Sequence, residues 1–360
     1  MTKLLTEAEI ALAEPERIAE LVCAHLTEHG ATAGRDAEGW TLTWPRATAR
    51  MSAAAGRLRI HAEAEDFEAL YWLRLGLASH VAEFAGAAAP TILWSGDGND
   101  ILTPPNFRLA RVAGVTQITP NMRRVTLTGD DLARFMTDDA LHVKLLAPTV
   151  PGRPAGVPTI GRDGVVVWPQ GEGAPARRTY TVRRFDRARQ TLDIDVVAHD
   201  APGPGARWAL SARAGDEIGV MGPGGGGIPQ AAELLIAGDE TALPAIARIL
   251  EALPRAARGR AIVEVADVDE IQPIAAPDGV ELVWRDRSAP QAPAGETLAD
   301  AVARAAPARP QDDVFLWAGC EFEDFRAIRA HARKTLGLPK ARHLVAAYWR
   351  RGRSESAREE

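Results

Sequence analysis

Three side chains of different chemistry stand close together in the segment Arg-Thr-Tyr-Thr-Val-Arg, residues 178–183. Arg178 supplies a permanent cation, Tyr180 an aromatic face and Thr181 a small hydroxyl. On a strand, Arg178 and Tyr180 share one face, and Thr181 and Arg183 share the other. Such a set could pair with a pyrophosphate, stack on a flat ring and reach a ring nitrogen, as a bound flavin requires. Taken alone, the six residues fit an exposed strand better, so the surrounding sequence must decide.

A glycine-containing turn downstream could hold the same cofactor. Residues 202–209 read Pro-Gly-Pro-Gly-Ala-Arg-Trp-Ala, which predicts a loop that opens a helix. Backbone N–H groups at such a helix start could cradle a pyrophosphate; a plain loop before a capped helix is the alternative. His199 ends the preceding β-rich run and could contact the cofactor or be merely structural. The candidate flavin-binding residues are Arg178, Tyr180, Thr181, Arg183, Asp195, His199, Gly205, Ala206, Arg207, Trp208 and Ala209.

A second turn has the features of a nucleotide site. Residues 238–245 follow a buried β-rich run and open a helix, but they lack the G-x-G-x-x-G fingerprint. Gly238 permits close approach of a ligand to the backbone, and Thr241 is placed to cap the helix. Asp239 and Glu240 would repel an anion, so they belong to the nicotinamide side or favour the helix dipole.

Two further segments would face the same crevice. Arg285 and Arg287 could hold the 2′-phosphate of NADPH, or they could be solvated loop arginines. Cys320 could approach the nicotinamide, although a small residue at a helix start explains it equally well. The candidate nicotinamide-binding residues are Gly238, Asp239, Glu240, Thr241, Ala242, Arg285, Arg287, Gly319 and Cys320.

Three blocks of different periodicity must position these residues. Residues 1–95 read as helix, several strands and helix, a small α+β domain. Residues 106–228 contain short β-rich runs between Gly, Pro and Asp, including one at residues 164–169, and predict an antiparallel barrel. Residues 229–352 alternate strand and helix, which predicts a parallel doubly wound sheet. The polar residues 353–360 are expected to be disordered. The predicted helices of the third block are 241–252, 296–304 and 322–336.

Composition narrows the functional classes. The chain has 360 residues and a formal net charge of -6, which gives no sign of nucleic-acid binding. Its two cysteines are too few for a cysteine-ligated iron–sulfur cluster, which takes about four. Redox chemistry would therefore need an organic cofactor or a partner. The sequence shows no signal peptide and no apolar run long enough for a bilayer, so we expect a cytoplasmic protein.

Several motifs in a fixed order give the chain a specific resemblance. A barrel followed by an α/β domain is the layout of ferredoxin-reductase-like flavoproteins, and residues 106–352 resemble the siderophore-interacting proteins, or ferric-siderophore reductases. Residues 1–95 resemble a small bacterial domain of unknown function. The matching motifs are the strand 178–183, the run ending in His199, the turn 205–209, Ala214-Gly215-Asp216, Gly222-Pro223-Gly224, and residues 120–127, 142–148, 237–250 and 346–352.

The resemblance implies a reaction. Arg178 would pair with the FAD pyrophosphate, Tyr180 would stack on the isoalloxazine, and Thr181 would lie near its reactive nitrogen. Electrons would pass from NADPH or NADH through FAD to a ferric siderophore, so that Fe(II) is released. No catalytic residue beyond FAD and no resident metal is expected. The alternatives are a siderophore-binding flavoprotein without turnover, and one that is reduced by ferredoxin.

The substrate region departs from the family pattern. Lys144 matches a family lysine that contacts the siderophore, and Arg350 is a second candidate contact. Some relatives add an arginine in the Gly-Pro-x-Gly turn and another before the final Ala-Tyr-Trp. Here the four residues that follow Pro223 are all glycine, and the later position is Leu344. A less charged chelate, such as a hydroxamate, becomes plausible.

The first block also contains a possible metal-binding motif. Residues 25–29 fit the pattern H-x-x-E-H of a zinc peptidase. His25 also continues the apolar stripe of its helix, and the sequence offers no evident third ligand. We therefore expect a helix with incidental histidines.

Overall fold

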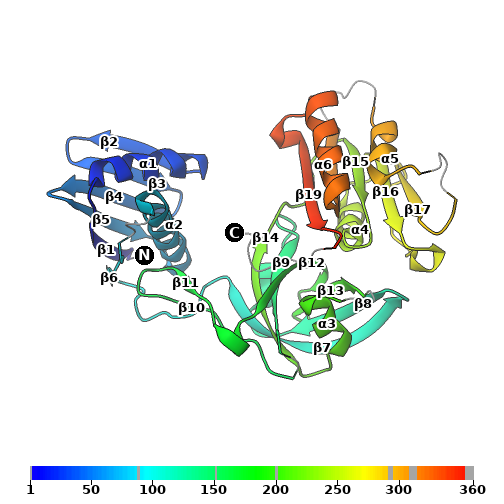
Figure 1. Cartoon of the computed structure of the whole chain (residues 1–360), viewed down its shortest axis with the longest axis horizontal. Helices are drawn as coiled ribbons and strands as arrows, with labels where there is room; N and C mark the ends of the chain where they lie inside the picture. The colour runs from blue at the N-terminus through cyan, green and yellow to red at the C-terminus, as the bar shows by residue number, and fades with distance from the viewer. Residues whose placement is uncertain are drawn as a thin grey trace. The chain divides into compact units, whose positions relative to one another are not determined.

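The computed structural model describes residues 2–86, 90–150, 152–198, 202–290, 295–307 and 314–352 (Figure 1). The chain divides into two compact units. The first comprises Met1–Phe107 with Gly156–Gln170, and the second comprises Arg108–Ala155 with Gly171–Glu360. The predicted tail 353–360 and His199 lie outside the described residues.

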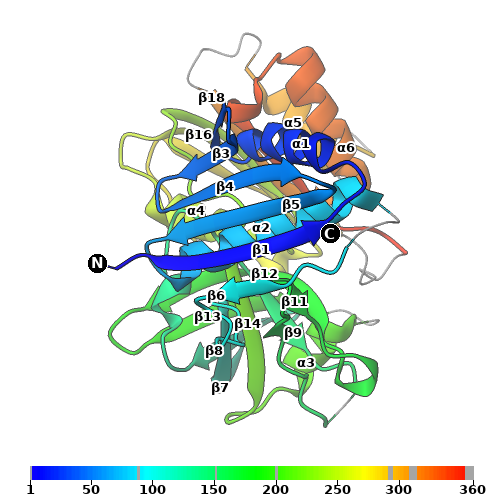
Figure 2. The same ribbon diagram turned by 90° about the vertical axis from the view of Figure 1, so that its left-hand side faces the viewer.

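The first unit is a six-stranded antiparallel sheet with two helices on one face. The sheet has the order β2-β3-β4-β5-β1-β6, and Figure 2 looks onto its face opposite α2. Alternate residues of each central strand are buried against the helices, as the alternating sequence predicts. The elements are β1 (Leu4–Ala11), α1 (Pro15–Glu28), β2 (Thr32–Asp36), β3 (Gly39–Trp44), β4 (Ala47–Ala54), β5 (Arg57–Ala64), α2 (Phe67–Ala85) and β6 (Trp94–Gly96).

A hairpin from later in the chain completes this unit. Strands β10 (Thr159–Ile160) and β11 (Val166–Val167) pair with each other and with no barrel strand. The Trp94 indole N–H donates to the Asp163 carbonyl oxygen at 2.8 Å, and Val165 packs against the core of the unit. The prediction that residues 164–169 form a barrel strand is therefore wrong, because the run forms this hairpin instead and Val165 joins the core of the first unit.

The second unit begins with a closed six-stranded barrel of order β12-β13-β8-β7-β14-β9. Its interior is filled by aliphatic side chains, and the short helix α3 packs against β12, β9, β13 and β8. The elements are β7 (Phe107–Thr119), β8 (Met122–Thr128), β9 (His142–Ala147), β12 (Ala176–Asp186), β13 (Thr191–Val197), α3 (Pro204–Ser211) and β14 (Glu217–Gly224).

A five-stranded parallel sheet of order β17-β16-β15-β18-β19 follows the barrel. Helix α4 packs on one face of this sheet, and α5 and α6 pack on the other. The sheet order reverses at β15 and β18, where a doubly wound fold opens a crevice at the carboxyl ends of its strands. The elements are β15 (Glu233–Gly238), α4 (Leu243–Ala252), β16 (Arg258–Val265), β17 (Val280–Asp286), α5 (Leu298–Ala305), β18 (Val314–Glu321), α6 (Phe322–Ala330), a π-helical turn (His331–Thr335) and β19 (His343–Trp349).

These observations confirm the predicted fold class: an α+β unit, an antiparallel barrel and a parallel α/β sheet. The domain boundaries 1–95, 106–228 and 229–352 stay predictions, since the compact units divide the chain in a different way. None of the helices in the described ranges is long and apolar enough to cross a membrane.

Candidate active site

Strand β12 and the start of α3 meet at Tyr180 and Gly205. A Cβ atom added to Gly205 would collide with the Tyr180 hydroxyl, so the helix start lies directly against this ring. Arg178 lies two residues before Tyr180 and thus on the same face of the strand. The structure therefore brings together the predicted aromatic ring and the glycine turn, with the predicted cation on the same strand face as the ring.

Helix α3 offers its backbone at this place. No side chain of the described residues caps its amino terminus at Gly203. The side chains of Ala206, Trp208 and Ala209 are buried in the barrel core, so these residues can present only main-chain atoms. Arg207 is exposed, and its guanidinium donates to the Pro202 carbonyl oxygen at 2.8 Å. A helix start with uncapped N–H groups suits an anionic ligand.

The outer face of the barrel carries Thr181 and Lys144. Thr181 pairs with His142 on β9, and the neighbouring Thr179 pairs with Lys144. Thr181 is buried, whereas Lys144 is exposed. The His142 Nε2 atom lies 2.7 Å from the Tyr348 hydroxyl oxygen on β19. The predicted flavin contact and the predicted substrate contact thus lie on one surface that the α/β sheet approaches.

His142 is a neutral side chain in this setting. Burial, with the positive charge of Arg248 as a smaller cause, lowers its pKa from 6.5 to about 4. Burial also raises the pKa of Tyr348. Both residues fall in motifs that carry the family resemblance, 142–148 and 346–352, but the sequence assigns no site role to either. Their position in these motifs is the sequence feature that could have pointed to them.

Leu344 of β19 lies against the glycine-rich turn that follows Pro223. A Cβ atom on Gly226, in the glycine-rich turn after Pro223, would collide with the Leu344 side chain. A Cβ atom on Gly225 would lie 2.7 Å from the His142 Nδ1 atom. The x position of the Gly-Pro-x-Gly turn is Gly224, and no atom lies within 4 Å of a Cβ added there.

The strand ends of the α/β sheet pack too tightly for any side chain. Gly238 of β15 pairs with Gly319 of β18. A Cβ atom on Gly238 would lie 2.6 Å from the Gly319 carbonyl oxygen, and one on Gly319 would lie 2.8 Å from the Tyr348 ring. Ala242 is fully buried against both glycines. The two glycines therefore let the strand ends pack together at the carboxyl edge of the sheet, which is where doubly wound folds bind nucleotides.

Comparisons with known proteins match this architecture. Family models match residues 111–227 (siderophore-interacting FAD-binding domain), residues 231–352 (siderophore-interacting protein) and residues 7–95 (an uncharacterized protein conserved in bacteria). The chain is 34% identical over 243 residues to the ferric vibriobactin reductase ViuB of Vibrio cholerae, covering 67% of this chain and 88% of that protein. The chain belongs to the siderophore-interacting protein family.

Two further relatives agree with this assignment. The NADPH-dependent ferric-chelate reductase of Escherichia coli is 32% identical over 254 residues, covering 68% of this chain and 92% of that protein. The crystal structure of a siderophore utilization protein from T. fusca is 40% identical with a TM-score of 0.61, covering 69% of this chain and 95% of that one. The family and the FAD cofactor predicted from the sequence are confirmed.

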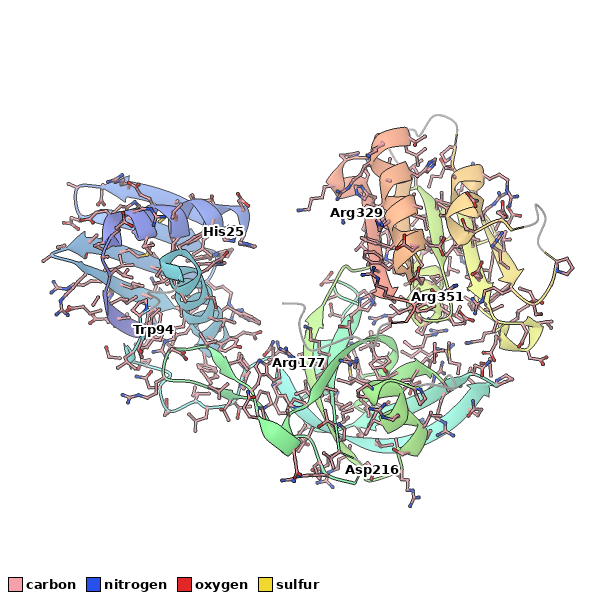
Figure 3. All side chains as sticks on the ribbon, viewed as in Figure 1. His25, Trp94, Arg177, Asp216, Arg329 and Arg351 are labelled. Carbon is pink, nitrogen blue, oxygen red and sulfur yellow. The ribbon has the colours of Figure 1, made fainter. Side chains whose placement is uncertain are left out.

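This siderophore-interacting protein has a site that fits FAD. The Tyr180 ring lies against the uncapped start of α3, where Gly205 leaves no Cβ between ring and helix, and Arg178 shares the strand face of Tyr180. Arg177, labelled in Figure 3, precedes these residues on the same strand. The individual contacts predicted for these residues remain predictions.

Asp239 organises the crevice instead of facing a ligand. Its buried carboxylate accepts from the Thr241 N–H at 2.9 Å, the Thr241 hydroxyl at 2.5 Å, the Glu321 N–H at 3.1 Å and the Trp349 indole N–H at 2.7 Å. Burial raises its pKa, and these hydrogen bonds oppose that rise. Thr241 does not cap α4, whose N-cap is Ala242 without a side-chain hydrogen bond. That prediction was wrong because Asp239 engages the hydroxyl.

The two arginines at the carboxyl end of β17, Arg285 within the strand and Arg287 after it, are both engaged in ion pairs. Arg285 is buried, and its guanidinium pairs with Glu296 at 2.5 Å and with Glu264 at 3.4 Å. Arg287 pairs with Glu240 and lies 3.5 Å from Glu264. Only Arg287 is exposed enough to present its guanidinium to a phosphate without unfolding its surroundings.

Other candidate residues serve the interior or the surface. Arg183 forms two hydrogen bonds of 2.7 and 2.6 Å to Glu251 of α4. The buried Asp195 carboxylate accepts two from Arg124, at 2.6 and 2.8 Å. Cys320 is buried between the sheet and helices α5 and α6, and burial raises the pKa of its thiol. The Arg350 guanidinium lies 4.4 Å from the Phe322 ring centre.

Proposed function

We propose that this protein is an FAD-dependent ferric-siderophore reductase of the cytoplasm that uses NADPH or NADH and releases Fe(II). The observation that carries the proposal is the meeting of Tyr180, on the strand with Arg178, and the uncapped start of α3. This constellation lies on the barrel that the FAD-binding family model matches. The named activities of the Vibrio cholerae and Escherichia coli relatives support the same reaction class.

The side chains of this chain position the cofactor and shape its surroundings. Arg178 and the N–H groups of Gly205 and Ala206 neutralise the pyrophosphate, and Tyr180 supports the ring system. Thr181, buried beside His142, offers a hydroxyl to the ring edge. FAD, when bound, accepts two electrons from a nicotinamide and passes them on one at a time.

The strand-end crevice holds the electron donor. Gly238 and Gly319 let the two strand ends pack closely against Ala242 and Tyr348, and Asp239 fixes the strands around them. The nicotinamide nucleotide would bind over this packed edge. Arg287 is the candidate contact for the 2′-phosphate, provided that it exchanges Glu240 for the phosphate. Binding of NADPH would therefore break the Arg287–Glu240 ion pair, whereas binding of NADH would leave it intact.

Iron enters as substrate and has no permanent ligand set in this chain. Lys144 presents a single cation on the exposed barrel face. Gly224 and Leu344 stand at the two positions where some relatives carry arginine, and neither supplies a charge. These features favour a ferric chelate of low negative charge, such as a hydroxamate. Ferrous iron binds the oxygen ligands of such chelates weakly, so reduction releases it.

Anaerobic mixing of the purified protein with NADPH, NADH or reduced ferredoxin, followed by flavin absorbance, tests the proposal. We expect a yellow protein that a reduced nicotinamide bleaches and that ferric hydroxamate re-oxidises with formation of Fe(II). Bleaching by ferredoxin alone would identify a different donor. Absence of bleaching by every donor would favour a siderophore-binding flavoprotein, and a colourless protein would overturn the assignment of the flavin site.

A further inference from the structure

Three histidines of the first unit converge on one point. His25 and His29 lie one turn apart at the carboxyl end of α1, and His80 lies on α2, which packs against α1. One ring nitrogen from each lies within 4.8 Å of the other two. In the described part of the chain, no other group of three His, Cys, Asp or Glu residues meets this criterion. Figure 3 labels His25 near the end of α1.

The geometry of this triad is close to that of a metal site. The His25 and His29 Nε2 atoms are 3.0 Å apart. With metal–nitrogen distances of about 2.0–2.1 Å, two imidazoles on a tetrahedral ion have nitrogens about 3.3 Å apart. Moving the two rings apart by a few tenths of an ångström thus admits an ion. The hydrogen bond between the two Nε2 atoms is replaced when the proton moves to Nδ1 of the donor ring.

A carboxylate prepares the third histidine for ligation. The His80 Nδ1 atom lies 3.1 Å from the Glu83 carboxylate, which accepts a hydrogen bond from the Nδ1–H group. The lone pair of His80 is then on Nε2. This carboxylate–histidine pairing is the usual second layer of a metal site, where it fixes the tautomer and raises the basicity of the ligand.

The surroundings favour a cation and leave it accessible. The last carbonyl groups of α1 carry partial negative charge near His25 and His29. Phe84 packs against His25 and His80, with ring centres at 5.9 and 6.2 Å, and forms an apolar wall on one side. His29 is exposed and the side chain of His80 is 19% exposed, so an ion can reach the triad.

We propose that His25, His29 and His80 form a binding site for a first-row divalent metal ion. Three imidazoles without thiolate suit Zn(II), Co(II), Ni(II) or Cu(II), and they do not suit Ca(II) or Mg(II). Three protein ligands leave at least one position for water or a further ligand. The sequence pattern H-x-x-E-H supplied only the first two ligands. The third was hidden because 50 residues and four strands separate His80 from His29. The proposal does not rest on the flavin chemistry.

Titration of the full-length protein with Co(II), followed by displacement with Zn(II), tests the site. We expect one equivalent of Co(II) to give visible d–d absorption that Zn(II) abolishes. His29→Gln and His80→Gln should each weaken Zn(II) binding by about 100-fold, and Glu83→Gln by about tenfold. His61→Gln, an exposed histidine of β5 outside the triad, should bind Zn(II) as the wild type does.

Circular dichroism and flavin absorbance establish that each variant is folded. His29 is exposed, so its substitution is the least disruptive of the three. Zn(II) affinity that is unchanged in both His29→Gln and His80→Gln would overturn the proposal. Absence of Co(II) or Zn(II) binding by the wild-type protein would also overturn it, whatever the protein's reductase activity.

Discussion

The Nε2 atom of His142 lies 2.7 Å from the hydroxyl oxygen of Tyr348, and this contact joins barrel strand β9 to β19 of the α/β sheet. The Tyr348 ring also packs against Gly319, whose strand end borders the nicotinamide crevice. His142 in turn pairs with Thr181, the predicted flavin contact. One hydrogen bond therefore links the barrel face at Thr181 to the strand end at Gly319, the two places proposed for FAD and the nicotinamide nucleotide.

Stability should depend on pH through His142. Burial lowers its pKa from 6.5 to about 4, so the unfolded chain takes up a proton at a higher pH than the folded chain does. This contribution is complete above about pH 6.5 and is lost as the pH falls toward 4, by about 3 kcal/mol in all. Urea unfolding at pH 7.5 and pH 5 measures it.

Two variants isolate this effect from the titration of other groups. His142→Phe should lose much less stability than the wild type between pH 7.5 and pH 5. Tyr348→Phe removes the hydrogen bond but leaves the imidazole buried, so it should keep most of the pH dependence. Equal pH dependence in His142→Phe and the wild type would contradict the buried neutral imidazole.

Gly205 should be needed for flavin binding because it has no Cβ. In Gly205→Ala the added atom collides with the Tyr180 hydroxyl, and the ring and helix start must separate. We expect FAD to bind at least about tenfold more weakly, which corresponds to about 1.4 kcal/mol. Gly203→Ala is the matched control, since no atom lies within 4 Å of its added Cβ. Equilibrium dialysis against FAD compares them, and equal affinities would remove the steric argument.

Two arginines of β12 should have different roles: Arg178 should bind FAD, and Arg183 should stabilise the fold. The double variant Arg178→Ala, Tyr180→Ala should lose FAD, as judged by flavin absorbance per mole of protein. Arg183→Met should retain FAD, because Arg183 is occupied by Glu251.

Arg183→Met should instead lower the free energy of unfolding by about 3 kcal/mol, since Glu251 loses the buried guanidinium that pairs with it. Burial tends to raise the pKa of Glu251, but the hydrogen bonds and charge of Arg183 outweigh it and lower that pKa. Stoichiometric FAD in the double variant would contradict the motif assignment, and loss of FAD from a folded Arg183→Met would contradict the structural role.

The sequence was sufficient for the architecture and for contacts between neighbours in a motif. Periodicity predicted the three types of fold, and Tyr180 and Gly205 were both in motifs that a flavin site requires. Partners far apart along the chain could not be predicted. Glu251 for Arg183 and Tyr348 for His142 are tertiary contacts that no local pattern encodes. The 164–169 run shows the same limit, because its β-rich composition did not reveal which core it would join.

Lys144 should determine how the enzyme discriminates between ferric chelates by charge. It is the predicted substrate cation on the exposed face of β9, opposite Thr179. Removing one partner of an exposed charge interaction costs about 1 kcal/mol, or about a fivefold change in KM. Lys144→Ala should therefore raise KM for an anionic ferric chelate about fivefold and leave KM for a neutral ferric hydroxamate nearly unchanged.

Steady-state assays with both chelates measure this split, and the rate of flavin reduction by NADPH should not change. Lys3→Ala removes an exposed cation of the first unit and is the charge-matched control. An equal rise in KM for both chelates would mean that Lys144 acts on the fold of the barrel face. No rise for either would mean that the substrate binds elsewhere. A selective rise for the anionic chelate would identify Lys144 as a charged contact of the substrate.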